Sequence, residues 1–230
     1  GMDIVIIVGL LILAAIALYG PHLWAKAVLN HYGRREYFSG NGMELARRLL
    51  DRSGIPDVRV ETTSLGDHYD PQAKAIRLSP ERCGRNTLTA VVVAAHEVGH
   101  AIQDHTGYPP FRSRTRWIVV GSRLERIGAG VMVAVPVVAM ITRVPAAGLL
   151  MFLGGLATLC IPLVIHLFTL PTEFDASFGR ALPILSTGEY IPPEDIPGAR
   201  RILLACSLTY VASALAGLLN VWRWIRILRR

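Results

Sequence analysis

Two histidines and a glutamate lie within five consecutive residues of this chain, His96-Glu97-Val98-Gly99-His100. The apolar run Val91 to Ala95 before them predicts a helix, and residues four apart on a helix project from the same face. The two imidazoles could therefore bind one metal ion, with the glutamate carboxylate beside an open coordination position. This arrangement is typical of zinc hydrolases, in which the carboxylate takes a proton from an activated water.

The alternative is an ordinary helix with two satisfied histidines and an exposed glutamate. The surrounding sequence disfavours it, because Asn86 or Thr87 can cap the helix and an apolar stripe follows. The stripe consists of Leu88, Val91, Val92, Ala95 and Val98. An uncompensated glutamate buried beside it would be costly unless a metal or a partner met the charge. The pattern therefore favours metal binding.

The chain is too apolar for a soluble domain of its size. Its residues are 52% hydrophobic and its mean hydropathy is +0.40. Four stretches are candidates to cross a bilayer core of about 30 Å. They are Ile4–Tyr19, Ile127–Thr142, which Pro136 interrupts, Val144–Leu170 and Ile202–Val221. We expect a mainly α integral membrane protein with about four transmembrane helices.

The net charge of +7 suggests nucleic acid, but the placement of the basic residues predicts a membrane surface instead. Basic and aromatic residues that flank apolar spans are interfacial anchors for lipid head groups. The first group is Arg112, Arg114, Arg116, Trp117, Arg123 and Arg126; the second is Trp222, Arg223, Trp224, Arg226, Arg229 and Arg230. We therefore expect membrane lipid as a partner and no nucleic acid.

Orientation follows from the basic residues near the ends of the spans. Lys26, Arg34 and Arg35 follow the first span and five arginines precede the second, which predicts a cytoplasmic region between them in a multi-pass plasma-membrane protein. Four spans then place the C-terminal arginines outside the cell, against the rule that basic residues near span ends stay on the cytoplasmic side. Either Ile202–Val221 does not cross fully or the tail stays at the interface. The first span has no basic residues before it and no clear cleavage site, which predicts an uncleaved anchor.

The polar region from His22 to Arg126 has the pattern of a small α+β domain. Gly42–Arg52 is predicted to be an amphipathic helix that ends near Ser53-Gly54. Asp57–Thr62 and Lys74–Ser79 are predicted strands. Their sheet edge could bind an extended peptide by strand addition, or they could form an ordinary hairpin packed on the helix. Cys83, Cys160 and Cys206 suggest no disulfide framework.

A catalytic zinc usually has three protein ligands, so a third is expected. The metzincin pattern would require a histidine at position 106, which is Thr106 here, and His105 is one residue short. The intramembrane class would require the motif inside a span and a later Leu-Asp-Gly, and neither is present. The remaining class takes a glutamate from a second helix.

Topology nominates that ligand. Two spans separate His100 from Leu170 and return the chain to the same side, where Glu173 and Asp175 are the first acidic residues. His166 lies about 10 Å from Glu173 on a continuous helix, too far to share one ion. We expect His166 to form an interhelical hydrogen bond.

Two segments around these residues resemble the signature segments of the YugP-like neutral zinc metallopeptidases of bacteria. They are His96-Glu97-Val98-Gly99-His100-Ala101-Ile102-Gln103 and Leu170-Pro171-Thr172-Glu173-Phe174-Asp175-Ala176-Ser177. Asp67–Pro71 with Arg77–Ser79, and Ile196–Arg200 with Leu208–Ala212, are also similar to that family. The resemblance implies a membrane-bound gluzincin peptidase with one zinc per chain. It makes His96, His100 and Glu173 the ligands and Glu97 the general base.

The sequence departs from the wider gluzincin pattern next to the third ligand. Those enzymes often have an aspartate four residues after the ligand glutamate, and this chain has Ser177 there and Asp175 two residues after Glu173. Which residue orients the ligand histidine is therefore open. Arg180 is a candidate to stabilise the oxyanion, with His68 and Tyr69 as weaker candidates.

These expectations divide the chain into five parts. They are an N-terminal anchor (1–20), a zincin-like region with the motif (21–126), a transmembrane hairpin (127–170), a second catalytic segment with the glutamate (171–201), and a C-terminal helix with a basic tail (202–230). The expected activity is hydrolysis of peptide bonds, in one reading confined to membrane-protein substrates. The alternative is a zinc-stabilised membrane scaffold, with His105 or Asp175 closing the site as a fourth ligand.

Overall fold

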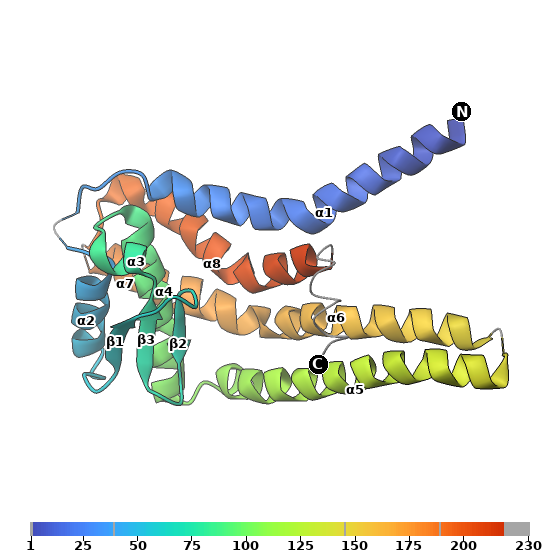
Figure 1. Cartoon of the computed structure of the whole chain (residues 1–230). Coiled ribbons are helices and arrows are strands. Elements are labelled where there is room, and N and C mark those ends of the chain that lie inside the picture. The colour runs from blue at the N-terminus through green and yellow to red at the C-terminus, as the bar shows by residue number, and fades with distance from the viewer. Residues whose placement is uncertain (1, 39, 145, 189, 219–230) are drawn as a thin grey trace. The chain divides into compact units, whose positions relative to one another are not determined.

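The computed structural model describes residues 2–38, 40–144, 146–188 and 190–218, which form mainly helices and divide into two compact units (Figure 1). The helical unit comprises residues 1–22, 113–168 and 210–230, and the site unit comprises residues 23–112 and 169–209. Four helices contribute residues to both units. They are α1 (Met2–Tyr32), α5 (Pro109–Thr142), α6 (Ala146–Phe174) and α8 (Ile196–Gly217).

Among the described residues, three helical stretches are long and apolar enough to cross a membrane. They are Met2–Tyr32, Ala146–Thr187 and Pro193–Gly217. These stretches overlap three of the four predicted spans: they contain the first, and they cover the third from residue 146 and the fourth to residue 217. The basic tail lies outside the described residues. The predicted span Ile127–Thr142 is helical as part of α5, but α5 is not among the three. The apolar helical character is thus confirmed, whereas four spans stay a prediction.

The site unit is built around α4 (Leu88–Thr106), which carries both histidines of the motif. Thr87 caps it by accepting a hydrogen bond from the backbone N–H of Ala90, and Gly107 ends it in the left-handed conformation. Almost every residue of α4 as far as Ala101 is buried. Because α4 is enclosed on all sides, its side chains are held in place by packing, which is what a metal site requires.

Helix α2 (Gly42–Arg52) is the amphipathic helix that the sequence predicts, and it packs against α4. Asn41 and Glu44 form a capping box at its start, which satisfies two backbone N–H groups. Leu45, Leu49 and Leu50 are buried in the common core with α4. The short helix α3 (Pro80–Gly84) links the sheet to α4.

The sheet differs from the predicted pair of strands. Strands β1 (Arg59–Thr62) and β3 (Ala75–Leu78) correspond to the two predictions, but they pair in parallel, so the hairpin interpretation of these two segments is wrong. A third strand, β2 (His68–Asp70), lies between them in sequence and pairs antiparallel with β3, giving the order β1-β3-β2. Strand β2 was not predicted, because three residues are too few to show alternation. A parallel pair needs a crossover connection, which the β2 segment supplies.

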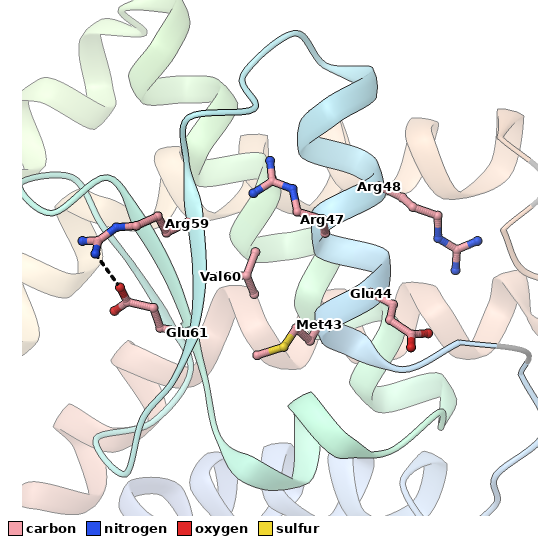
Figure 2. Close-up of a pocket in the computed structure, with 7 residues that line it drawn as sticks. All are labelled: Met43, Glu44, Arg47, Arg48, Arg59, Val60 and Glu61. Carbon is pink, nitrogen blue, oxygen red and sulfur yellow. Dashed lines mark ion pairs between the residues drawn. The ribbon is translucent and has the colours of Figure 1, made fainter.

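A groove of about 800 Å³ opens between α2 and the outer edge of β1 (Figure 2). It is lined by Met43, Glu44, Arg47, Arg48, Arg59, Val60 and Glu61. Arg47 donates hydrogen bonds to the carbonyls of Pro56 and Val58, which ties α2 to the chain entering β1. Strands β1 and β2 are the two edges of the sheet, and addition of a peptide strand at either edge stays a prediction.

The turn between β2 and β3 depends on Asp70. Its carboxylate accepts hydrogen bonds from the backbone N–H groups of Ala73 and Gln72 and pairs with Arg77. The Ala73 N–H, followed by the Gln72 N–H and Arg77, holds the pKa of Asp70 below its usual value. A carboxyl with a lowered pKa stabilises the fold above its unfolded-state pKa of about 4, and the contribution is lost as the pH falls through the folded-state value.

We therefore expect Asp70→Asn to lower the melting temperature of the metal-free protein at pH 7. The difference from the parent should shrink as the pH falls below about 4, because the parent's carboxyl then becomes neutral as well. Thermal unfolding of both proteins in detergent, followed by circular dichroism at several pH values, measures the difference. A difference that is the same at pH 7 and pH 3 would contradict this role of the charge.

Candidate metal centre

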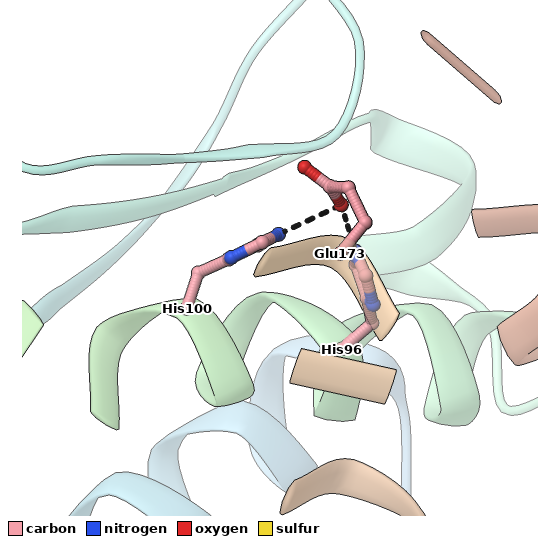
Figure 3. Close-up of side chains that lie close together, drawn as sticks. All are labelled: His96, His100 and Glu173. Atoms are coloured by element: carbon pink, nitrogen blue, oxygen red, sulfur yellow. Dashed lines mark hydrogen bonds and ion pairs between the residues drawn. The ribbon is translucent and has the colours of Figure 1, made fainter. Parts of the chain in front are cut away.

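Three buried side chains from two segments of the site unit converge on one point (Figure 3). His96 and His100 project from α4, and Glu173 projects from the last turn of α6. Glu173 Oε2 lies 3.2 Å from His96 Nε2 and 3.1 Å from His100 Nε2. One ligand atom of each residue lies within 4.8 Å of the others, and His96, His100 and Glu173 are 3%, 3% and 0% exposed.

The spacing of these atoms suits zinc. Ligand atoms bound to tetrahedral zinc at 2.0–2.1 Å lie about 3.3 Å from one another. The two distances from Glu173 to the imidazoles are within about 0.2 Å of that value. Two imidazole nitrogens and one carboxylate oxygen are also a donor set used by catalytic zinc sites.

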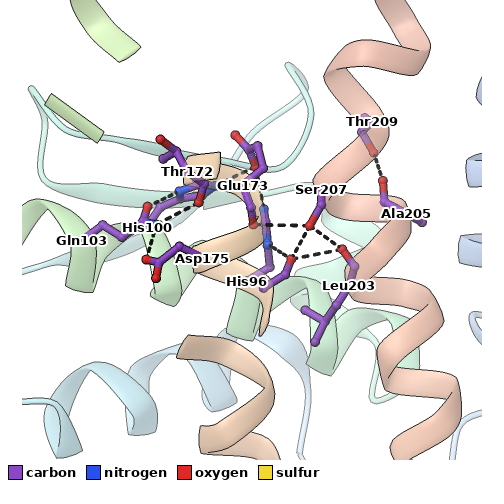
Figure 4. Close-up of polar contacts among 11 residues, drawn as sticks. His96, His100, Gln103, Thr172, Glu173, Asp175, Leu203, Ala205, Ser207 and Thr209 are labelled. Carbon is purple, nitrogen blue, oxygen red and sulfur yellow. Dashed lines mark hydrogen bonds and ion pairs between the residues drawn. The ribbon is translucent and has the colours of Figure 1, made fainter. Parts of the chain in front are cut away.

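The far side of the His96 ring shows which of its nitrogens presents a lone pair to the centre. His96 Nδ1 lies 2.8 Å from Ser177 Oγ, and the Ser177 hydroxyl donates to the carbonyl of Leu203 at 3.0 Å. Since the single Ser177 hydrogen is used in that bond, Ser177 accepts a hydrogen bond from Nδ1–H of His96. Ser207 Oγ lies 2.8 Å from Ser177 Oγ and 2.9 Å from the Leu203 carbonyl, so it contacts both partners of this hydrogen bond (Figure 4).

His100 is held in the corresponding way. Its Nδ1 lies 2.9 Å from Oε1 of the buried Gln103, which accepts the Nδ1 hydrogen. In the neutral form of both rings, each Nε2 therefore presents a lone pair to the Glu173 carboxylate. Two imidazole lone pairs and a carboxylate that face one another in a buried site are stabilised by a cation bound among them. The residues present fit a bound zinc ion.

The segment after Glu173 approaches α4 unusually closely. Residues Asp175–Ala181 form a π-helix, η1, which packs directly on α4. Gly99, between the two histidines, permits this approach, because a Cβ there would lie 2.5 Å from the carbonyl oxygen of Ala176. A π-helical turn widens the helix locally and is frequent at functional sites. Gly99 and η1 together bring Glu173 within reach of both imidazoles.

The proposed base, Glu97, directly follows His96 on α4 and is only 6% exposed. Asp175, the rival of Glu173, lies outside the three-residue cluster. It accepts hydrogen bonds from Gln103 Nε2 at 2.8 Å and from Arg180 Nε at 2.7 Å. Of the two acidic residues that topology nominates, the described structure thus brings Glu173 to the histidines and gives Asp175 other partners.

The remaining candidates each have contacts with residues outside the three-residue cluster. Arg180, bound to Asp175, also lies over the ring of Tyr108 at 5.3 Å. His68 is partly exposed, with Nδ1 2.8 Å from the carbonyl of Gly66. Tyr69 donates its hydroxyl to Asp104 at 2.7 Å, and burial together with that carboxylate raises the pKa of Tyr69.

His105 and His166 are the two other candidate histidine ligands. His105 is exposed near the end of α4 and is not part of the described cluster. His166 belongs to the helical unit, where its ring stacks on Tyr210 at 5.3 Å. The interhelical hydrogen bond that we expect for His166 stays a prediction.

Gly99, Gln103 and Ser207 contribute to the centre without having been predicted as site residues. Gln103 was detectable, because positions 96, 100 and 103 lie on one face of a helix. Ser207 was visible only as a polar residue within an apolar stretch, which does not identify its partner. The role of Gly99 depends on the approach of a segment over seventy residues away and has no local signal.

Comparison with known proteins identifies the family of this chain. The sequence profile of the family described as "Putative neutral zinc metallopeptidase" matches residues 5–229. The chain belongs to this family, which confirms the resemblance noted from its motifs and implies zinc as the metal. It is 36% identical over 227 residues to a Bacillus subtilis (strain 168) protein named "Putative membrane protease YugP", covering 95% of this chain and 96% of the relative. No solved structure matches the chain significantly.

Proposed function

We propose that this protein is a membrane-bound zinc metalloendopeptidase of the gluzincin type. His96, His100 and Glu173 hold one zinc ion, and Glu97 is the general base. The observation that carries the proposal is the convergence of two imidazole nitrogens and a carboxylate oxygen in a buried site, with the outer nitrogens of both rings hydrogen-bonded. Such outer hydrogen bonds are characteristic of metal-bound histidines.

In the proposed reaction, Glu97 moves a proton twice. A bound zinc would lower the pKa of a water to about 7 and polarise the scissile carbonyl. The Glu97 carboxylate takes a proton from the attacking water as the new C–O bond forms. It then delivers that proton to the leaving nitrogen as the C–N bond breaks, giving a carboxylic acid and an amine. The burial of Glu97 supports this role, since a carboxylate shielded from bulk water exchanges its proton with the substrate.

The oxyanion formed in this step needs a cationic or hydrogen-bonding partner. Arg180 is our first candidate, since its guanidinium is held by Asp175 on one side and by the Tyr108 ring on the other. Tyr69 is less suitable because its hydroxyl is already donated to Asp104. His68 is on β2, the edge strand antiparallel to β3, and we retain it as a second candidate.

The membrane character suggests the substrates. Exposed apolar side chains along α1, α5 and α6 support a multi-pass protein, and the name of the B. subtilis relative includes the words "membrane protease". We propose four spans, a cytoplasmic catalytic region, and substrates that are membrane proteins or protein segments near the membrane. The basic residues that flank the apolar stretches support contact with anionic lipids.

The scaffold alternative requires a fourth protein ligand in place of water. Asp175 is engaged by Gln103 and Arg180, and His105 is exposed, so neither side chain is arranged to close the site among the described residues. A three-ligand site with an adjoining carboxylate supports catalysis over a purely structural role.

Cleavage of a fluorescently labelled unfolded protein by the detergent-purified chain tests the proposal. We expect hydrolysis that 1,10-phenanthroline abolishes and that added zinc restores, because the chelator removes the ion that the three ligands hold. A matched preparation with His100→Ala controls for contaminating proteases. Equal cleavage by the parent and by His100→Ala would contradict the assignment of the activity to this site.

A further inference from the structure

One buried side chain connects the two halves of the candidate centre. Gln103 is fully buried on α4 (0% exposed), three residues after His100. Its Oε1 lies 2.9 Å from His100 Nδ1, and its Nε2 donates to the Thr172 carbonyl and to Asp175 Oδ2, both at 2.8 Å (Figure 4). Thr172 immediately precedes Glu173, so one amide contacts a histidine of one segment and the backbone that carries the glutamate of the other.

The partners of the amide fix its orientation. A backbone carbonyl and a carboxylate only accept hydrogen bonds, so the two N–H groups of Gln103 must face Thr172 and Asp175. The amide oxygen then faces His100, which must donate from Nδ1. Nε2 of His100 is thereby left with its lone pair toward Glu173, as metal ligation requires.

The amide also belongs to a longer chain of contacts on the Glu173 side. Oδ2 of Asp175 accepts hydrogen bonds from both Gln103 Nε2 and Arg180 Nε, the latter at 2.7 Å. The Arg180 guanidinium in turn lies over the Tyr108 ring. Among the hydrogen bonds of the described residues, His96 is oriented through Ser177 and the carbonyl of Leu203 and not through the amide. The other imidazole thus does not depend on Gln103.

We propose, resting on the zinc site of the proposed function, that Gln103 is the positioning residue of the metal centre. It sets the tautomer of His100 and fixes the distance between α4 and the Thr172–Glu173 backbone, so that both ligands are in place before the ion arrives. No other side chain type offers one acceptor and two donors at this length. Loss of such an outer hydrogen bond typically lowers metal affinity 10- to 100-fold.

Zinc affinity, measured by competition with a chromophoric chelator, tests this role in the full-length protein. Gln103→Met keeps the length of the side chain and removes every hydrogen bond. Gln103→Glu keeps the shape and the acceptor but replaces the donors with an oxygen. We expect both variants to bind zinc about 10- to 100-fold more weakly than the parent. Gln72→Met, at the chain's other glutamine in the exposed β2–β3 turn, is the matched control and should bind zinc like the parent.

A second readout separates positioning from general stability. The visible absorption of the Co²⁺-substituted protein depends on the arrangement of the ligands, and we expect it to change in Gln103→Met and not in Gln72→Met. Zinc affinity of both Gln103 variants within twofold of the parent would overturn the inference. Failure of both variants to fold would also overturn it, because Gln103 would then serve the core as a whole. A parent that binds no zinc would refute the proposed function itself.

Discussion

Replacing Glu97 with Gln is expected to lower the rate of peptide hydrolysis by about 10²- to 10⁴-fold and to leave the zinc content unchanged. The amide has nearly the same shape as the carboxylate, so the buried position after His96 remains filled. It cannot accept a proton from water at neutral pH, so the proton transfer on which the proposed reaction depends is lost. The initial rate of cleavage of a labelled unfolded protein, with metal analysis of the same sample, measures both quantities.

Glu81→Gln is the matched control for this substitution. Glu81 lies on α3, where its side chain is 76% exposed and pairs only distantly with Arg82 at 3.8 Å. The control should cleave at the parent's rate. If Glu97→Gln also cleaves at the parent's rate with full zinc content, Glu97 is not the base. If it loses zinc as well, the carboxylate serves the metal site and not the proton transfer.

Replacing Gly99 with Ala is expected to have the second large effect. The added Cβ would lie 2.5 Å from the Ala176 carbonyl oxygen and 3.1 Å from its carbon, both backbone atoms. The η1 segment must therefore move away from α4, and Glu173, two residues before it, moves with it. We expect a loss of about 1–3 kcal/mol in stability from overpacking, together with weakened zinc binding and reduced hydrolysis.

Gly84→Ala provides the comparison, because a Cβ at this helical glycine meets nothing within 4 Å. It should bind zinc like the parent and be equally stable or slightly more stable, since alanine favours the helix by up to about 1 kcal/mol. Thermal unfolding and zinc competition for the two variants give the result. Gly99→Ala with the parent's zinc affinity would mean that the close contact of α4 with η1 does not position the third ligand.

Much of the centre could be predicted because its signals are local. The His96-Glu97-Val98-Gly99-His100 motif and the apolar stripe lie on α4 as expected from helical geometry, and Thr87, one of the two predicted capping residues, caps its start. Glu173 could be nominated because two predicted apolar spans would return the chain to the same side of a membrane. Asp175 was an equal candidate on that ground, and only the side-chain positions distinguish the two residues.

The remaining features depend on contacts between distant segments. The pairing of β1 with β3 depends on a crossover through a strand of three residues, too short to show a pattern. The π-helix η1 has no residue signature in Asp175–Ala181, and its widened turn is visible only where it packs on α4. Ser177 lies at the position where gluzincins often have an aspartate. Its hydroxyl contacts His96 and donates to the carbonyl of Leu203 on α8, a distant partner that no local pattern indicates.

Zinc stoichiometry of the detergent-purified protein tests the central claim most directly. We expect one zinc per chain in the parent and in Asp175→Ala at saturating zinc, and less than about one tenth of that in Glu173→Ala under the same conditions. The reason is that Glu173 is the acidic residue whose oxygen meets both imidazoles. One zinc per chain in Glu173→Ala, or none in the parent, would contradict the metal centre described above.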